Sequence, residues 1–180
     1  MKIFLLRLIT VTLVGCPFAA SADDSKLQQA LSHVPKAELV GEGQLSYMFW
    51  DIYDASLYAP EGNFKADKPF VLSLSYLRDF TGKEIAERSI KVMGEQQLCE
   101  STHFPKWEDE MKDIFPDMRE GDLLTGVRDS QGNARFFHNG SEVGVIETPD
   151  FTQCFFAIWL DEKTSEPELR QQLLGNANDQ

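Results

Sequence analysis

The sequence predicts an α+β fold in which a layer of helices covers an antiparallel sheet. Strand-like and helical segments come in blocks: strands precede two helices, and further strands precede two more. Short turn motifs such as Asn139-Gly140, which join antiparallel neighbours, separate the later strand-like segments. The length of 180 residues fits one domain. A doubly wound or barrel fold is therefore not expected.

The first expected elements are a helix and two strands. Residues 23–33 carry apolar side chains at helical spacing, and the pattern ends before Pro35. Residues 37–47 and 50–59 are rich in aromatic and β-branched side chains, which predicts two paired strands.

Residues 70–78 form the clearest strand. Ser73 and Ser75 point to one face, whereas the opposite face is apolar and carries Phe70, Leu72, Leu74 and Tyr76. Arg78 continues the alternation, so it is expected on that apolar face.

Two helices are expected next. Thr81 and Glu84 have the spacing of a capping box, which predicts a helix that begins at Thr81 and runs to about Gln97. The second helix covers residues 106–115 and stops at Pro116.

Three short strands and two helices complete the predicted order. The strands cover residues 122–128, 134–138 and 142–147, and the first helix covers residues 150–160. Ser165 is expected to cap the last helix, with Pro167 at its start and Gly175 at its end.

Residues 1–22 read as a secretory signal peptide that is cut after Ala22. They combine a basic start, a short apolar run and small residues before the cut, so residues 23–180 form the mature domain. An alternative is a lipoprotein anchored at Cys16, because Leu13 to Cys16 resemble a lipobox. We expect a periplasmic or secreted protein, held at a membrane only if Cys16 is lipidated.

The charge of the chain bears on its partners. The whole chain has 17 basic and 29 acidic residues, a net charge of −12. Residues 1–22 hold two of the basic residues and no acidic one, so the mature chain has 15 basic and 29 acidic residues, a net charge of −14. Because affinity for nucleic acid depends on basic residues that neutralise phosphates, no nucleic-acid partner is expected.

The mature chain keeps two cysteines, Cys99 and Cys154. In an oxidising compartment they are a candidate disulfide, with two buried thiols as the alternative. The chain has no metal-binding, phosphate-loop or nucleophile-elbow motif, and its three histidines lack ligand spacing. We therefore expect neither a metal nor a cofactor.

Arg78 is the conspicuous candidate for ligand binding, because a cation on an apolar strand face needs a partner. One interpretation is that it pairs with a local carboxylate such as Asp79 or Asp54, or reaches water. The other is that it points into an apolar cavity and binds an acidic head group with help from tyrosine hydroxyls, the candidates being Tyr53, Tyr58 and Tyr76.

Four parts of the chain carry a recognisable pattern: residues 41–43 with 52–58, residues 77–82, residues 115–122, and the ending formed by residues 155–160 and 164–175. Together they resemble the chalcone isomerase-like family, in particular an exported bacterial branch. The resemblance covers nearly all of the mature chain. It implies an open-faced β-sandwich with helices over the sheet.

The resemblance also bears on activity. Where the plant enzyme that cyclises chalcones has an arginine, a threonine, a tyrosine and an asparagine, this chain has, by approximate alignment, Gly41 or Glu42, Tyr53, Ile85 and Val92. Only a hydroxyl at Thr164 or Ser165 matches. Loss of these groups weakens stabilisation of a phenolate or oxyanion, which argues against the plant mechanism.

Other proteins of this superfamily bind fatty acids without catalysis through an arginine and a tyrosine. The residues and the resemblance together predict an exported, non-catalytic protein that binds a small hydrophobic, fatty-acid-like ligand. The alternatives are an intramolecular lyase or isomerase of chalcone-isomerase type that acts on an unidentified substrate, and an interaction protein with a filled core and no cavity.

Overall fold

The computed structural model describes residues 22–175, which form one sheet and five α-helices. The strands are β1 (Ala37–Tyr47), β2 (Trp50–Pro60), β3 (Phe70–Tyr76), β4 (Leu123–Arg128), β5 (Ala134–His138) and β6 (Ser141–Ile146). They lie in sequence order, and every neighbouring pair is antiparallel. The predicted α+β fold with an antiparallel sheet is confirmed.

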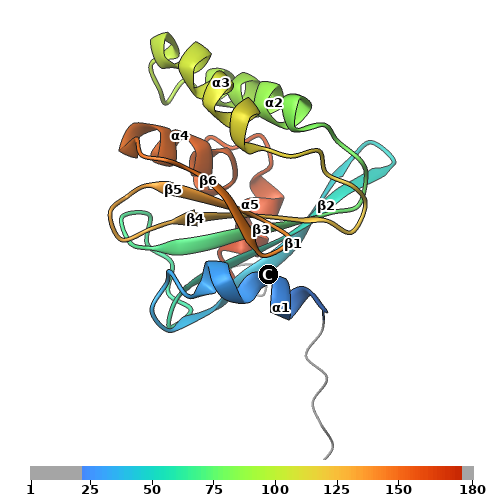
Figure 1. Cartoon of the computed structure of the whole chain (residues 1–180), viewed down its shortest axis with the longest axis vertical. Helices are drawn as coiled ribbons and strands as arrows, with labels where there is room; N and C mark the ends of the chain where they lie inside the picture. Colours follow the sequence, from blue (N-terminus) through green and yellow to red (C-terminus); the bar gives the residue numbers. More distant parts are fainter. Residues whose placement is uncertain (1–21, 176–180) are drawn as a thin grey trace, which may run out of the picture.

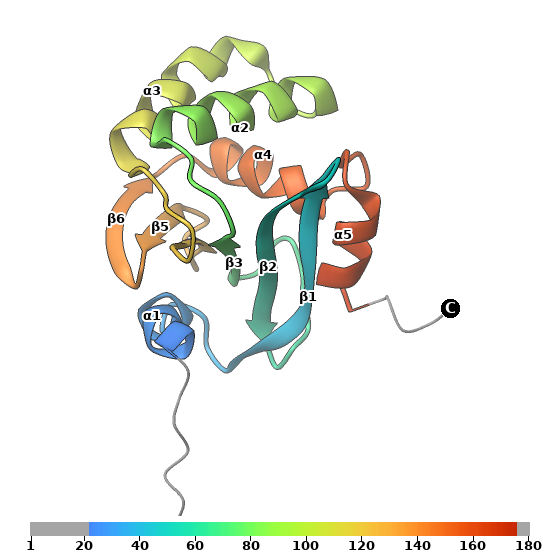
Figure 2. The same cartoon turned by 90° about the vertical axis from the view of Figure 1, so that its right-hand side faces the viewer.

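The helices are α1 (Ala22–Leu31), α2 (Gly82–Gln96), α3 (Phe104–Ile114), α4 (Pro149–Leu160) and α5 (Pro167–Leu173), with a 3₁₀ turn at Ser101–His103. Figure 1 shows α4 directly over one face of the sheet, α2 and α3 as an outer layer above it, and α1 against the opposite face. Figure 2 shows α5 beside β1. We call the two faces of the sheet the α4 face and the α1 face.

The larger hydrophobic core lies between the α4 face and the helices. Strand alternation turns Leu57, Leu72 and Phe136 toward α4, and each is 2% exposed or less. Aromatic side chains of α4 fill the space above them, because Phe151 and Phe155 pack on Phe136 with ring centroids 6.3 and 5.1 Å away. This core holds α4 on the sheet mainly by apolar burial.

A smaller core lies under α1. Leu27, Ala30 and Val34 pack against Val71 and Phe137 on the α1 face. On the same face, the hydroxyls of Ser73 and Thr125 lie 3.1 Å apart in a buried hydrogen bond. Both faces of the central strands are therefore buried, which the alternating serines of β3 did not predict.

Two helix starts test the capping predictions. The Thr81 hydroxyl accepts a hydrogen bond from the Glu84 amide and the Glu84 carboxylate accepts one from the Thr81 amide, so the capping box is confirmed. The prediction that Ser165 caps the last helix, α5, is wrong. Glu166 is the N-cap residue, and its amide donates to the Thr164 hydroxyl at 3.1 Å. Thr164 makes this contact because its own hydroxyl is held by the Ile158 carbonyl.

A disulfide joins Cys99, which follows α2, to Cys154 in α4, with the two Cα atoms 6.2 Å apart. It links the outer helical layer to the helix that packs on the sheet. The Gln96 side chain adds a hydrogen bond across the same contact, from Nε2 to the Ala157 carbonyl at 2.9 Å.

The expected signal peptide, except for Ala22, and the expected lipidation site Cys16 lie outside the described residues. Within residues 22–175, no helix is long and apolar enough to cross a membrane.

Candidate functional site

Two of the candidate tyrosines meet on the α4 face. Tyr53 of β2 and Tyr76 of β3 are direct cross-strand neighbours, and their ring centroids are 5.8 Å apart. The indole Nε1 of Trp159 in α4 donates a hydrogen bond to the Tyr53 hydroxyl at 2.8 Å. These three residues form a small polar cluster inside an otherwise apolar core.

The tyrosine hydroxyls stay protonated. Burial raises the pKa of Tyr53 and the pKa of Tyr76 well above the usual tyrosine range, because an ionised phenol loses its hydration in the core. The Tyr53 oxygen already accepts a hydrogen bond from the Trp159 indole N–H, so the Tyr53 O–H is the group that can donate to a ligand oxygen. The cluster is therefore suited to donate hydrogen bonds.

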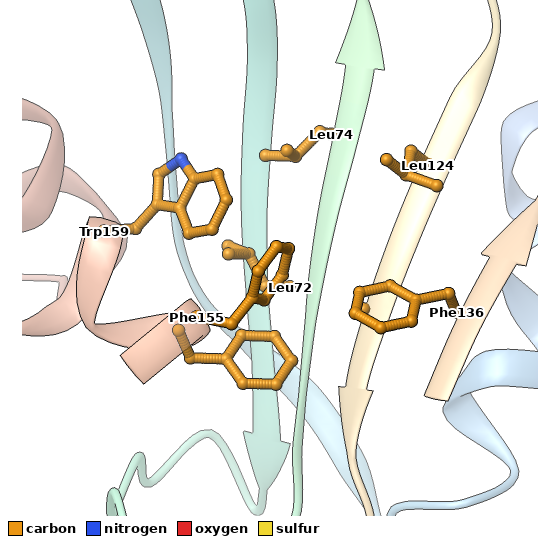
Figure 3. Close-up of a pocket in the computed structure, with 8 residues that line it drawn as sticks. Leu72, Leu74, Leu124, Phe136, Phe155 and Trp159 are labelled. Carbon is orange, nitrogen blue, oxygen red and sulfur yellow. The ribbon is translucent and has the colours of Figure 1, made fainter. Parts of the chain in front are cut away.

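A small apolar void adjoins this cluster. Its volume is about 10 Å³, and its lining comes from β3, β4, β5 and α4. Figure 3 shows Leu72, Leu74, Leu124, Phe136, Phe155 and Trp159 converging on it. A void of this size has room for about one water molecule, and an apolar lining leaves such a space dry. It is a gap in the packing between the sheet and α4.

A larger groove opens at the other end of β3 and β4. It measures about 410 Å³ and lies between α4, the β2–β3 loop and the turn after β4. The large apolar side chains of its lining are Phe64, Phe70, Phe156 and Leu160, and Arg128 is the one cation of the lining. We call it the Arg128 groove.

The Arg128 groove is next to the void. Phe156 lines both, and the edge of its ring packs against Phe70 with centroids 4.8 Å apart. Phe70 and Arg128 are direct cross-strand neighbours, so Arg128 continues the α4 face at the end of β4. The Phe156 side chain therefore borders both the groove and the void.

The prediction that Arg78 shares the face of Phe70 and Tyr76 is wrong. β3 ends at Tyr76, so the alternation that would turn Arg78 toward α4 stops two residues earlier. The half-buried Arg78 stacks its guanidinium on the indole of Trp50, 4.0 Å from the ring centroid. Trp50 is 57% exposed and starts β2, so this contact lies at the surface.

Tyr58 does not join the other two tyrosines. It lies an odd number of residues from Tyr53 along β2 and so faces the opposite side, where it packs against the small core under α1. The alternation of side chains within β2 is by itself enough to separate Tyr58 from Tyr53.

Sequence reasoning missed Arg128 and the pairing of Trp159 with Tyr53. The signal for Arg128 was present, because Leu124, Gly126 and Arg128 alternate along β4 as Phe70, Leu72 and Leu74 do along β3. No comparable signal identified Trp159, which is 106 residues from Tyr53.

Within residues 22–175, no three side chains among the histidines, cysteines, aspartates and glutamates are placed to hold a metal ion. His138 instead lies 3.4 Å from the carboxylate of Asp122 near the β5–β6 turn.

Comparison with known proteins identifies a family and solved structures of similar fold. A family model described as chalcone isomerase-like matches residues 21–175. A crystal structure of a fatty-acid binding protein of Arabidopsis thaliana superposes with a TM-score of 0.64 at 12% identity and covers 78% of this chain and 88% of that one. At this identity the likeness shows a shared fold. No curated protein matches the chain in sequence.

Proposed function

The chain belongs to the chalcone isomerase-like family, and we propose that it is an exported, non-catalytic member of a bacterial branch that binds a small hydrophobic acid. The ligand lies between the sheet and α4, with its apolar part against the core of the α4 face.

The observation that carries this proposal is the Arg128 groove and the void behind it. Small-molecule sites occupy roughly 300–1,000 Å³ and are mostly apolar with a few polar groups. The groove, at about 410 Å³, falls in that range. The aromatic side chains of Phe64, Phe70 and Phe156 suit the apolar chain of an amphipathic anion. Arg128, the single cation of the lining, suits its charged head group.

The polar cluster marks the inner end of this region. Trp159, which lines the void, donates a hydrogen bond to the buried Tyr53 hydroxyl at 2.8 Å. The fatty-acid binding neighbour lends support as a protein of the same fold.

One observation favours the alternative of an isomerase or lyase. A protonated Tyr53 held by Trp159 is the kind of donor that polarises a carbonyl and stabilises an oxyanion. Conversion of chalcones or related enones by the wild type, lost in Tyr53→Phe and kept in Tyr58→Phe, would support this alternative over simple binding.

Binding is tested with the protein purified from its host. Native mass spectrometry is expected to find a bound apolar acid, and dodecanoate or hexadecanoate is expected to raise the melting temperature of the delipidated protein. No bound molecule and no thermal shift with either acid would contradict the proposal.

Export is tested by the mass of the protein recovered from the host envelope. Cleavage after Ala22 predicts a mature chain that begins at Asp23 and carries no lipid. A chain that begins at a lipidated Cys16 would instead establish the anchored form, and an intact Met1 in the cytoplasm would contradict export.

A further inference from the structure

Arg128 has no carboxylate partner among residues 22–175. Its guanidinium makes one long hydrogen bond, from Nη1 to the Asp129 carbonyl at 3.5 Å. The neighbouring Asp129 carboxylate is occupied, because it accepts from the amides of Gln131 and Asn133 and from Arg135 Nε, each at 2.9 Å. Burial alone raises the pKa of Asp129, but these hydrogen bonds outweigh it and lower that pKa below its usual value.

The acidic residues around the groove have their own local roles. Asp67 lies 3.7 Å from Lys68, Asp161 accepts the Lys163 amide at 2.9 Å, and Asp150 is in the first turn of α4, where the helix dipole favours a carboxylate. None of the three forms an ion pair with Arg128. The groove therefore combines one available cation with an acidic rim.

A row of aromatic rings leads from the groove to the interior. Phe64 packs on Phe70 with ring centroids 5.2 Å apart, and Phe70 packs on Phe156. The Phe156 ring lies over Gly126, where an added Cβ would come within 2.9 Å of the ring. The glycine thus makes room for this ring between the groove and the void.

We propose that the hydrophobic acid enters through the Arg128 groove, pairs its carboxylate with Arg128, and displaces the Phe156 ring so that its chain extends under α4 toward Tyr53. This orientation rests on the proposed function and adds the entry point and the head-group site. It assigns the anion to Arg128 on the α4 face, since Arg78 stacks on Trp50 at the surface.

Charge and burial favour this orientation over the reverse. Arg128 is half-buried, so a carboxylate paired with it keeps contact with water, whereas a carboxylate beside Tyr53 would lose its hydration among apolar side chains. The acidic rim repels a second negative charge at the mouth, as in the head group of dodecyl phosphate. A second carboxylate at the far end of the chain, as in dodecanedioate, would lose its hydration among apolar side chains. The site is therefore selective for monocarboxylates over both dianions.

The test compares dodecanoate with dodecan-1-ol, which has the same chain and no charge. In Arg128→Gln, the affinity for dodecanoate is expected to fall about tenfold or more while the affinity for dodecan-1-ol stays within about twofold. Arg78→Gln is the matched control and keeps the wild-type preference for the acid. Dodecanedioate is expected to bind the wild type about tenfold more weakly than dodecanoate, because its second carboxylate would be buried among apolar side chains.

The outcomes separate the two proposals. If neither dodecanoate nor dodecan-1-ol binds the wild type, the proposed function is wrong. If the wild type binds and Arg128→Gln keeps its preference for the acid, or Arg78→Gln loses it, the head-group site is wrong. If Arg128→Gln lowers the affinity for dodecanoate and the affinity for dodecan-1-ol equally, Arg128 does not recognise the charge of the acid.

A crystal structure of the wild type with 12-bromododecanoate tests the orientation without any variant. The anomalous signal of bromine is expected beside Trp159, with the carboxylate at Arg128. Bromine in the groove, with the carboxylate at Tyr53, would overturn the proposed orientation.

Discussion

Removal of the disulfide in a Cys99→Ala/Cys154→Ala variant is expected to lower the free energy of unfolding by about 4 kcal/mol. The bond closes a loop between residues 55 apart in sequence, and cross-linking a loop of that length strongly restricts the unfolded chain. That loop contains α3 and the strands β4, β5 and β6, which are half of the sheet. The bond at its ends joins the segment after α2 to α4.

Urea unfolding at constant pH measures this effect, and reductant supplies the control. Dithiothreitol should lower the stability of the wild type by a similar amount and leave the double variant unchanged. A wild type whose midpoint does not respond to reductant, under conditions where free thiols are detected, would contradict the expectation. A stabilising bond of this kind also suits a protein that folds in an oxidising compartment.

Gly41→Ala is expected to destabilise the protein by about 3 kcal/mol, at the upper end of the usual cost of overpacking. An added Cβ at this position would lie 2.1 Å from the Gln172 carbonyl oxygen and 2.7 Å from that of Leu173. Both atoms belong to the backbone of α5, so no side-chain rotation relieves the clash. The end of α5 must move away from β1.

Gly94→Ala is the matched control, because the same methyl group has the opposite effect there. Gly94 lies inside α2, and its added Cβ would meet only a Phe104 ring atom at 3.5 Å, an ordinary contact. Alanine in a helix interior is expected to raise stability by about 0.5–1 kcal/mol. Urea unfolding of both variants should give shifts of opposite sign, and shifts of the same sign would contradict this account of Gly41.

Local chemistry explains which elements could be predicted. The capping box at Thr81 and Glu84 and the turn at Asn139-Gly140 depend on residues within a few positions of each other, and the structure contains both. The bounds of β1 and β5 also agree with the pattern of side chains. These features need no information about distant parts of the chain.

The end of β3 depends on a distant segment. The carbonyl of Asp122 accepts from the Tyr76 amide, and the Gly121 amide donates to the Tyr76 carbonyl, so the segment before β4 completes the pairing of β3 at Tyr76. Arg78 then leaves the strand. A pattern within residues 70–78 cannot show where the pairing of the strand ends, and for that reason strand alternation alone places Arg78 on the wrong face.

The α+β class, the order of the elements and the alternation within each strand follow from the amino-acid sequence, because they depend on local propensity and on the period of apolar residues. Packing between distant elements decides the rest. It places α1 over one face and α4 over the other, brings Trp159 to Tyr53, and turns Arg128 instead of Arg78 toward the groove. Alternation assigns a side chain to a face, but only cross-strand register and the helices that cover each face determine what that side chain meets.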